Sequence, residues 1–472
     1  MNPAGASHPA ETRRRLPPGP AGHFLIGNFP LGSRDPLGVL SGWAKLYGDI
    51  FHYRAFHIHV YFISHPDFIE SVLAANSRDF IKGRGLQVNR QLFGNGLLTA
   101  EGEFWRRQRR LCQPSFHRER IESYAQWMVS CTERMLEGWR EGESRNLQAD
   151  LRQLTLEIVA KALFDIEIGN KAREIGRALN AVMEFNSRGR ILMPLVRFLP
   201  TPRNVGYQLG VRRLDGIVWA MIRERLSRKG EGNDLLSSLL SARSESGNEM
   251  DLKQVRDEVM TLLLAGHETT ALAVCWSFYL LARHPEVERK LLEELQTVVG
   301  ERSPAGADVP KLSYAAQVLK ESLRLYPPAY AIARVAARDC DIGGYRVPRG
   351  ASVVMSPWVT HHDGRFFNNP DVFDPERWTE EFAHGLPKFA YFPFGGGPRV
   401  CIGTGFATME ATLLMVTILQ RFHLQMESPH EVVPLPAITL RPKGGMNVVP
   451  TRQRLAMTAE RTLLRQPSSL TL

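Results

Sequence analysis

The chain has 472 residues, enough for two to four domains or for one large domain with a sizeable core. Its five cysteines are few, odd in number and scattered, so no disulfide framework is implied and a reducing compartment is expected. No Cys-x-x-Cys pair is present, which argues against a zinc site and a redox-active dithiol. The net charge of +10 suits an acidic protein, an acidic membrane or nucleic acid, but no nucleic-acid-binding motif accompanies it, so we expect no nucleic acid.

The first residues predict no membrane anchor. Residues 1–15 are polar, end in three arginines and lack the apolar core of a signal peptide. Leu-Pro-Pro-Gly-Pro at 16–20 then predicts a stiff, extended segment. We therefore expect a cytoplasmic protein with no transmembrane anchor. Its expected parts are a polar and proline-rich segment at 1–35, one large domain at 36–450 and a flexible, arginine-rich tail at 451–472.

Helical patterns dominate the chain. Two β-rich runs at 50–54 and 57–63 predict a hairpin. Helices are expected over 67–75, over 103–139 with a break at Gln113-Pro114, and over 151–164, 171–185 and 211–229, with an interruption at 194–202. Glycines predict a hairpin turn at 344–350, before a buried strand at 352–355. Few strands among many helices indicate a mainly α fold with small β-sheets (α+β) in a single domain.

One predicted helix is apolar enough to cross a bilayer. Residues 259–282 are almost continuously apolar, and the spacing of Asp251 and Gln254 predicts a capping box that starts the helix upstream. The polar cluster Gly266-His-Glu-Thr-Thr in its middle is costly in lipid. We therefore expect a long helix through the core of a large domain.

The stretch Phe394-Gly-Gly-Gly-Pro-Arg-Val-Cys401-Ile-Gly403 places a lone cysteine among glycines. Such a cysteine is usually a small buried hydrophobe, and a P-loop is excluded because Lys-Ser/Thr does not follow the glycines. Here Arg399 and the start of a following helix are expected to favour the thiolate. A single thiolate suits one soft metal ligand, and haem iron is the obvious candidate.

The spacing Phe-x-x-Gly-x-Arg-x-Cys-x-Gly resembles the haem-binding signature of cytochrome P-450, the haem-thiolate monooxygenases. The resemblance extends from about Pro17 to about Pro450. It implies that Cys401 ligates the iron of heme b through an axial thiolate, within a loop that includes Phe394, Arg399 and Gly403. Microsomal members usually carry a membrane helix before the proline segment, so its absence points to a soluble bacterial protein.

The middle of the long helix resembles the Ala/Gly-Gly-x-Asp/Glu-Thr-Thr motif of the same family. On its own, the segment fits a buried helix with a tolerated glycine and threonines bonded to the backbone equally well. By the resemblance, Glu268 and Thr269 are the acid–alcohol pair that delivers protons during oxygen activation, and Gly266 opens the oxygen pocket. His267 falls at the variable position and receives no role.

Two further constellations resemble family elements. Glu321-Ser-Leu-Arg324 could be a surface ion pair, but with Arg377 it resembles the buried Glu-x-x-Arg network that fixes the haem-side core. Trp105 and Arg109 resemble the Trp-x-x-x-Arg element that reaches a haem propionate. By the same resemblance, Arg334 and Arg399 complete the propionate cations, and the remaining arginines of this run, Arg106, Arg107 and Arg110, could dock an acidic electron donor.

The resemblance implies a monooxygenase that uses O2 and a hydrophobic substrate, with a lipid or terpenoid favoured. About 70 residues follow Cys401, too few for a fused flavin reductase, so a separate ferredoxin or flavodoxin type donor with its NAD(P)H reductase is expected. The alternatives are a haem-thiolate peroxygenase or isomerase, and a non-catalytic haem-binding sensor. By family analogy, the substrate pocket is formed by residues 80–99, 182–205, 328–335 and 434–445.

Overall fold

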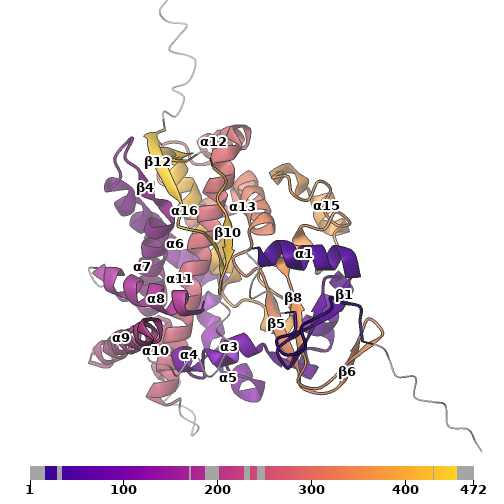
Figure 1. The fold of residues 1–472 in the computed structure, drawn as a ribbon. Coiled ribbons are helices and arrows are strands. Elements are labelled where there is room, and N and C mark those ends of the chain that lie inside the picture. Colours follow the sequence, from indigo (N-terminus) through magenta and orange to yellow (C-terminus); the bar gives the residue numbers. More distant parts are fainter. Residues whose placement is uncertain are drawn as a thin grey trace, which may run out of the picture.

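The computed structural model describes residues 16–28, 35–169, 172–186, 201–227, 234–241, 250–428 and 430–453. Long helices gather on one side of the molecule and the largest sheet lies on the other (Figure 1). Most of the expected C-terminal tail and part of the expected N-terminal segment lie outside the described residues. The expected domain limits therefore stay a prediction.

Helices make up most of the described chain. They are α1 (Pro36–Tyr47), α2 (Pro66–Glu70), α3 (Arg84–Val88), α4 (Arg90–Phe93), α5 (Gly102–Cys112), α6 (Arg118–Glu137), α7 (Leu147–Phe164), α8 (Ala172–Asn186), α9 (Pro202–Ser227), α10 (Leu235–Ser241), α11 (Leu252–Arg283), α12 (Pro285–Val298), α13 (Ser313–Leu325), α14 (Pro357–His361), α15 (Glu380–Gly385) and α16 (Thr404–Arg421). The break at Gln113-Pro114 is confirmed, because a 3-10 turn separates α5 from α6.

Two predicted helix starts are wrong. Helix α7 begins at Leu147, where the Asn146 side chain caps it, and not at residue 151. Helix α9 begins at Pro202, not at residue 211. Proline fits the first helical position, where its missing N–H is not needed. The hydroxyl of Thr201 accepts a hydrogen bond from the Asn204 N–H at 3.2 Å, so a capping side chain precedes the proline. The expected interruption at 194–202 lies mostly outside the described residues.

The largest sheet joins strands from two distant parts of the chain. Its order is β1-β2-β8-β5-β3, and only the β2–β8 pair is parallel. The strands are β1 (Ile50–Ala55), β2 (Ile58–Ile63), β3 (Phe80–Lys82), β5 (Ile332–Ala336) and β8 (Ser352–Met355). The predicted hairpin over 50–63 and the strand at 352–355 are confirmed.

Three smaller sheets of two or three strands are also present in the described chain. They consist of β4 (Arg145–Asn146), β12 (Asn447–Arg452) and β9 (Phe422–Met426), of β10 (Pro434–Pro436) with β11 (Leu440–Pro442), and of β6 (Cys340–Ile342) with β7 (Tyr345–Val347). The turn predicted over 344–350 is therefore misplaced. It lies at Gly343-Gly344, where both residues have positive φ, as a two-residue hairpin turn requires.

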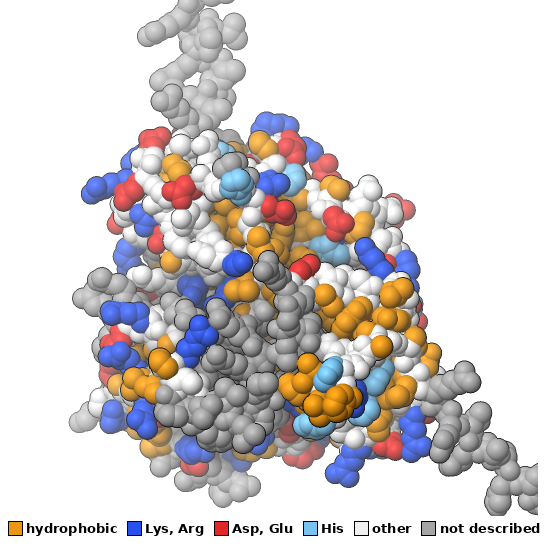
Figure 2. Space-filling view, in the orientation of Figure 1, with side chains coloured by type: hydrophobic (Ala, Val, Ile, Leu, Met, Phe, Trp, Pro, Cys, Tyr) orange, Lys and Arg blue, Asp and Glu red, His pale blue; other side chains and the backbone are white. Residues whose placement is uncertain are grey.

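A loop ahead of β1 carries exposed apolar side chains. Phe24, Leu25 and Ile26 are 75%, 65% and 47% exposed. The loop is fixed by backbone hydrogen bonds from Asn28 to Arg54 and from Phe56 to Ile26. In the view of Figure 2, apolar side chains form several groups, and many charged side chains lie toward the edge of the molecule.

Helix α11 runs through the core, as predicted. The Asp251 side chain accepts the Gln254 N–H at 2.6 Å, whereas the Gln254 amide bonds to Asn95 and Glu258, so only one half of the expected capping box forms. The helix is long and apolar enough to cross a membrane, but 83% of its most apolar window is buried inside the protein. Helices α7, α13 and α16 pack against it and complete the main hydrophobic core.

The expected buried network forms between α13 and the 3-10 turn at Pro375–Arg377, about 50 residues further along the chain. Glu321 and Arg324 are fully buried and joined by two hydrogen bonds of 2.7 and 2.8 Å. Arg377 and Trp378 each donate to the same carboxylate at 2.9 Å. Arg324 also donates to the backbone carbonyls of 361, 370 and 372. The network therefore ties α13 to the segment that leads into the cysteine loop.

Candidate functional site

A cavity of about 380 Å³ separates α11 from the cysteine loop. Seven of the residues singled out from the sequence line it, namely Trp105, Arg109, Thr269, Arg334, Phe394, Arg399 and Cys401. Gly266, Glu268 and Gly403 are not among its lining residues. The cavity therefore brings together residues that are up to about 300 positions apart in the chain.

The cysteine loop presents the sulfur of Cys401 to this cavity. The Cys401 N–H donates to the Phe394 carbonyl at 3.0 Å, which closes the loop just before α16 begins. Gly397 has a φ of +66°, and a Cβ added there would lie 1.8 Å from the Leu73 carbonyl oxygen. Only glycine fits this position, so the glycine run is explained by close backbone approach.

The environment of the Cys401 thiol differs from the one expected. Burial raises the pKa of this thiol, while the Gly403 N–H, the Thr404 hydroxyl and the Arg109 guanidinium each lower it. Arg399 was expected to favour the thiolate, but it points to Glu101 and the Phe80 carbonyl instead, at 2.6 and 2.8 Å. A bound metal cation would replace the proton of a ligating thiol outright, and coordination would then stabilise the thiolate.

The cations at the edge of the cavity are not equivalent. Arg109 donates to the Val400 carbonyl at 2.7 Å and so also holds the cysteine loop. Arg399 is neutralised by its ion pair with Glu101. Arg334 is 8% exposed, donates to the Ala333 carbonyl, and has no ion pair within 4 Å in the described part of the chain. Burial, followed by the charge of Arg399, lowers the pKa of Arg334 to about 10.

Lys82 is a cavity cation that the sequence analysis missed. It is 5% exposed, and its ammonium donates to the carbonyls of Leu97 and Ala100 at 2.8 and 2.6 Å. Burial lowers the pKa of Lys82 to about 7, partly offset by Glu101. Lys82 and Arg399 both lie over the Trp105 ring, 5.7 Å from its centroid. No local motif marks this lysine, because its partners come from a later loop.

The opposite wall of the cavity is formed by α11. Ala265 and Thr269, four residues apart on one face, both line the cavity. The Thr269 hydroxyl donates to the Ala265 carbonyl at 2.9 Å. Glu268 is 1% exposed and neither carboxylate oxygen has a hydrogen bond among the described residues. Its nearest described cation is Arg152 of α7, with 4.0 Å between Nη2 and Oε1.

Gly266 serves helix packing and is not part of the cavity wall. A Cβ added to Gly266 would lie 2.8 Å from Cγ2 of Val159 on α7. This contact explains the glycine by packing, and the expectation that it opens the oxygen pocket stays a prediction. The missing side chain lets α7 and α11 approach closely, because a β-branched valine occupies the space.

Replacing Gly266 with alanine tests this packing role. Overpacking costs about 1–3 kcal/mol, and alanine is about 1 kcal/mol better than glycine within a helix. We expect Gly266→Ala to destabilise the protein by about 1 kcal/mol, measured by denaturant unfolding. In a Val159→Ala background the same substitution is expected to stabilise by about 1 kcal/mol, because only the helix propensity remains. A loss of stability in both backgrounds would contradict this explanation.

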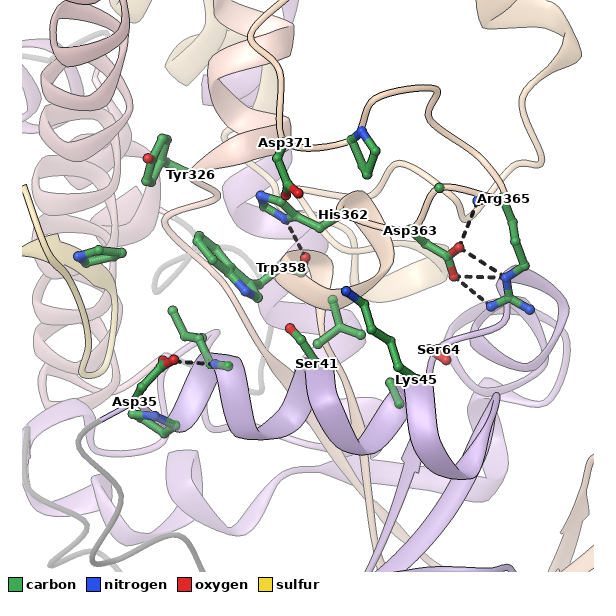
Figure 3. Close-up of a pocket in the computed structure, with 18 of the residues that line it drawn as sticks. Asp35, Ser41, Lys45, Ser64, Tyr326, Trp358, His362, Asp363, Arg365 and Asp371 are labelled. Atoms are coloured by element: carbon green, nitrogen blue, oxygen red, sulfur yellow. Dashed lines mark hydrogen bonds and ion pairs between the residues drawn. The ribbon is translucent and has the colours of Figure 1, made fainter. Parts of the chain in front are cut away.

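A larger cavity of about 1040 Å³ lies elsewhere, between α1 and α14 (Figure 3). Figure 3 shows Ser41 and Lys45 extending from α1 toward Trp358 and His362. Its rim is polar, and its Arg365 is already paired with Asp363 and Asp49. None of the sequence-predicted site residues lines it. The smaller cavity at Cys401 is therefore the candidate active site.

Comparison with known proteins identifies the family. A sequence profile described as Cytochrome P450 matches residues 17–448. The chain belongs to the cytochrome P450 family. Cyclooctatin synthase of Streptomyces melanosporofaciens is 36% identical over 448 residues, which cover 94% of this chain and 95% of that protein. Cyclooctat-9-en-7-ol 5-monooxygenase of the same organism is 35% identical, with 93% and 94% covered. Pentalenene oxygenase of Streptomyces avermitilis is 34% identical, with 92% and 95% covered.

Membership of the cytochrome P450 family makes the protein a monooxygenase, an oxidoreductase that uses haem iron with a thiolate ligand. The three Streptomyces relatives support a bacterial P450. Enzymes of this family use O2, hydrophobic substrates and redox partners. The expectations of a P450, of a mainly α fold with small sheets and of a monooxygenase are thereby confirmed.

The cavity fits a haem group on three observations. Cys401 offers its sulfur on one wall, while Ala265 and Thr269 form the wall opposite. Arg334 is a buried cation without a carboxylate partner in the described residues, which suits a propionate. The remaining lining is mostly apolar, as an aromatic macrocycle requires. No described group of three or more His, Cys, Asp or Glu side chains competes as a metal site.

The segments expected to form the substrate pocket contribute unequally. Leu86, Leu97 and Leu98 come from residues 80–99, and Pro328, Ala329 and Ile332 come from residues 328–335. The segment 182–205 lies mostly outside the described residues. The fourth segment, 434–445, contributes nothing to the cavity and lines a separate surface pocket instead. Its two short strands, β10 and β11, pair with each other and lie beside the N-terminus of α7.

Proposed function

We propose that this P450 oxygenates a cyclic terpene hydrocarbon. The observation that carries the proposal is an apolar part of the cavity lining that comes from residues 80–99 and 328–335. It is formed by Leu86, Leu97, Leu98, Ala329 and Ile332. Such a lining binds a hydrocarbon by excluding water, and its own five side chains offer no hydrogen-bonding group. The names of two relatives, a cyclooctat-9-en-7-ol 5-monooxygenase and a pentalenene oxygenase, support this substrate class.

We assign heme b as the cofactor, and Cys401 as the residue that would supply its thiolate ligand. When bound, haem iron with a thiolate ligand supplies the reductive activation of O2. Arg334 would neutralise one propionate in a buried ion pair, and Lys82 or Arg109 the other. The Trp105 ring packs against the cationic groups of Lys82 and Arg399. Phe394 and Gly403 belong to the backbone loop that holds the Cys401 sulfur.

The residues of α11 would deliver protons to the cavity. Thr269 places its hydroxyl at the cavity wall, where it can donate a hydrogen bond or pass on a proton. Glu268, the next residue along the chain, is a buried carboxyl group without a hydrogen-bonded partner in the described residues, so it is suited to exchange a proton with water. This pair favours a monooxygenase over a peroxygenase or isomerase, which needs no protons from an external relay.

Ligand-induced spectral change tests the substrate class. Entry of a hydrocarbon into the cavity is expected to shift ferric haem from low to high spin, because it displaces water near the iron. We expect pentalenene to produce this shift at micromolar concentration, and a polar aromatic acid of similar size to produce none. The opposite result would exclude the terpenoid assignment.

Replacing Thr269 with alanine tests the proton relay. We expect product formation to fall about 100-fold, the lower range for loss of a positioned proton-transfer group. Oxygen consumption should continue, with reduced oxygen released as peroxide. The measurement is the ratio of product to NAD(P)H consumed. Thr269→Ser keeps the hydroxyl and should restore most of this ratio, whereas equal losses in both variants would indicate a packing role instead.

The redox partner is proposed from surface charge. Arg106 and Arg110 of α5 are exposed, and α5 also supplies Trp105 and Arg109 to the cavity. A basic surface so close to the haem edge suits an acidic ferredoxin or flavodoxin that receives electrons from an NAD(P)H reductase. Such a partner system fits a cytoplasmic location. Peroxide-driven turnover that exceeds turnover with this chain of electron donors would favour the peroxygenase alternative.

A further inference from the structure

Three buried polar atoms on the α7 side of α11 have no hydrogen bond among the described residues. They are both carboxylate oxygens of Glu268 and Nε2 of His267. The two side chains are each 1% exposed. Buried polar groups almost always bond to protein or to ordered water. Since no protein partner is present for these atoms in the described chain, their arrangement indicates bound water between α7 and α11.

Arg152 connects this buried site to the surface. Its Nη2 lies 4.0 Å from Oε1 of Glu268, longer than the 2.7–2.9 Å of a direct charged hydrogen bond. A separation of this size leaves the carboxylate free to bond a bridging water. The nearby charge of Arg152 also helps to keep His267 neutral, since burial and this cation lower the pKa of His267 to about 4.

Arg152 also lines a pocket on the outside of the protein. This surface pocket, of about 380 Å³, lies where the N-terminus of α7 meets the β10–β11 hairpin. Its lining residues are Asn146, Gln148, Ala149, Arg152, Leu435, Arg441, Pro442, Gly444 and Gly445. Arg152 therefore both lines this pocket and lies beside Glu268. By contrast, Glu268 is not among the lining residues of the haem cavity.

We propose that this surface pocket is where solvent protons enter the enzyme, and that Arg152 is the positioning residue that holds Glu268 between the pocket and Thr269. The inference rests on the proposed monooxygenase function and adds the route by which its protons arrive. In each turnover one O2, two electrons from the redox partner and two protons convert a C–H group to C–OH and release one water. Glu268 takes each proton from pocket water and passes it toward the Thr269 hydroxyl.

The pocket can be closed without altering Arg152 or Glu268. Ala149 is exposed and lines the pocket, so Ala149→Trp is expected to fill it. Gln153→Trp adds the same side chain to an exposed position of the same helix outside the pocket, and serves as the matched control. Oxygen consumption driven by NAD(P)H, a ferredoxin and its reductase is measured in H2O and D2O, with and without pentalenene.

We expect Ala149→Trp to slow oxygen consumption about tenfold, less than complete loss of a proton-transfer group, and to enlarge the H2O/D2O rate ratio. Gln153→Trp should match wild type in both. Arg152→Met should lower the ratio of product to NAD(P)H consumed, and Arg152→Lys should recover part of it. A normal ferrous–CO thiolate band shows in each variant that the haem site is intact.

The inference would be overturned if Ala149→Trp kept the wild-type rate and isotope ratio and Arg152→Met kept the wild-type ratio of product to NAD(P)H consumed. The proposed function would survive that result if wild-type protein still showed the thiolate band and oxidised pentalenene. Conversely, wild-type protein that lacks the band and does not consume oxygen would overturn the proposed function itself. A loss of activity in Gln153→Trp equal to that in Ala149→Trp would also count against the pocket, because the added bulk alone would explain it.

Discussion

Replacing Cys401 with alanine is expected to abolish the haem-thiolate spectrum and all NAD(P)H-driven oxygenation. Its sulfur is the thiol that faces the cavity, and no other cysteine lines it among the described residues. Without this thiolate, the protein would lose both the anchor for haem and the electron donation by which a thiolate favours O–O cleavage. The measurement is the ferrous–CO difference spectrum of the purified protein, combined with its haem content.

Cys340→Ala provides the matched control. Cys340 is a partly buried cysteine in β6, and the cavity does not include it. Its replacement should leave the thiolate band and the haem content unchanged. A normal thiolate band in Cys401→Ala would refute the assignment of the ligand, and loss of the band in Cys340→Ala would indicate that the effect reports general damage to the fold.

The cysteine loop could be predicted from the sequence because its determinants are local. Glycines at fixed positions allow the backbone to pass close to Leu73 and to place Cys401 at the start of α16. Helix α11 was predictable for a similar reason, since one apolar run with a capping aspartate specifies both its burial and its beginning.

Contacts between distant segments could not be predicted in this way. Arg399 pairs with Glu101 across 298 positions, so the cation expected at a propionate is already neutralised. Lys82 enters the cavity because β3 pairs with β5, which places it opposite Arg334 in the register of the sheet. No local sequence pattern predicts the Arg399–Glu101 ion pair or the position of Lys82 in the cavity.

The sequence also did not predict which way each residue of the α11 motif faces. Gly266, Glu268 and Thr269 belong to one motif, but only Thr269 lines the cavity. Gly266 faces Val159 and Glu268 lies near Arg152, both on α7. At 100° per residue, neighbouring positions of a helix meet different surroundings, so a motif that is continuous in sequence is divided between the cavity and the packing of α7 against α11.

The largest expected effect on stability follows replacement of Glu321 with glutamine. This fully buried carboxylate accepts hydrogen bonds from Arg324, Arg377 and Trp378 and from the backbone of Asp374. Glutamine keeps the shape but removes the negative charge, which leaves the guanidinium groups of Arg324 and Arg377 with no ion-pair partner among the described residues. Breaking a buried ion pair by removal of one partner costs about 3–5 kcal/mol. We expect a loss of this size in the free energy of unfolding.

A surface pair supplies the control for the Glu321 variant. Glu293 pairs with Arg289 on α12, and both side chains are more than 60% exposed. Glu293→Gln should cost less than about 1 kcal/mol, because water and salt screen this pair. Both variants are compared by denaturant unfolding with haem retention as the second readout. Because the Glu321 network ties α13 to the segment before the cysteine loop, Glu321→Gln should also release haem at lower denaturant concentration. A Glu321 variant as stable as the Glu293 variant would show that the network does not secure the haem-side core.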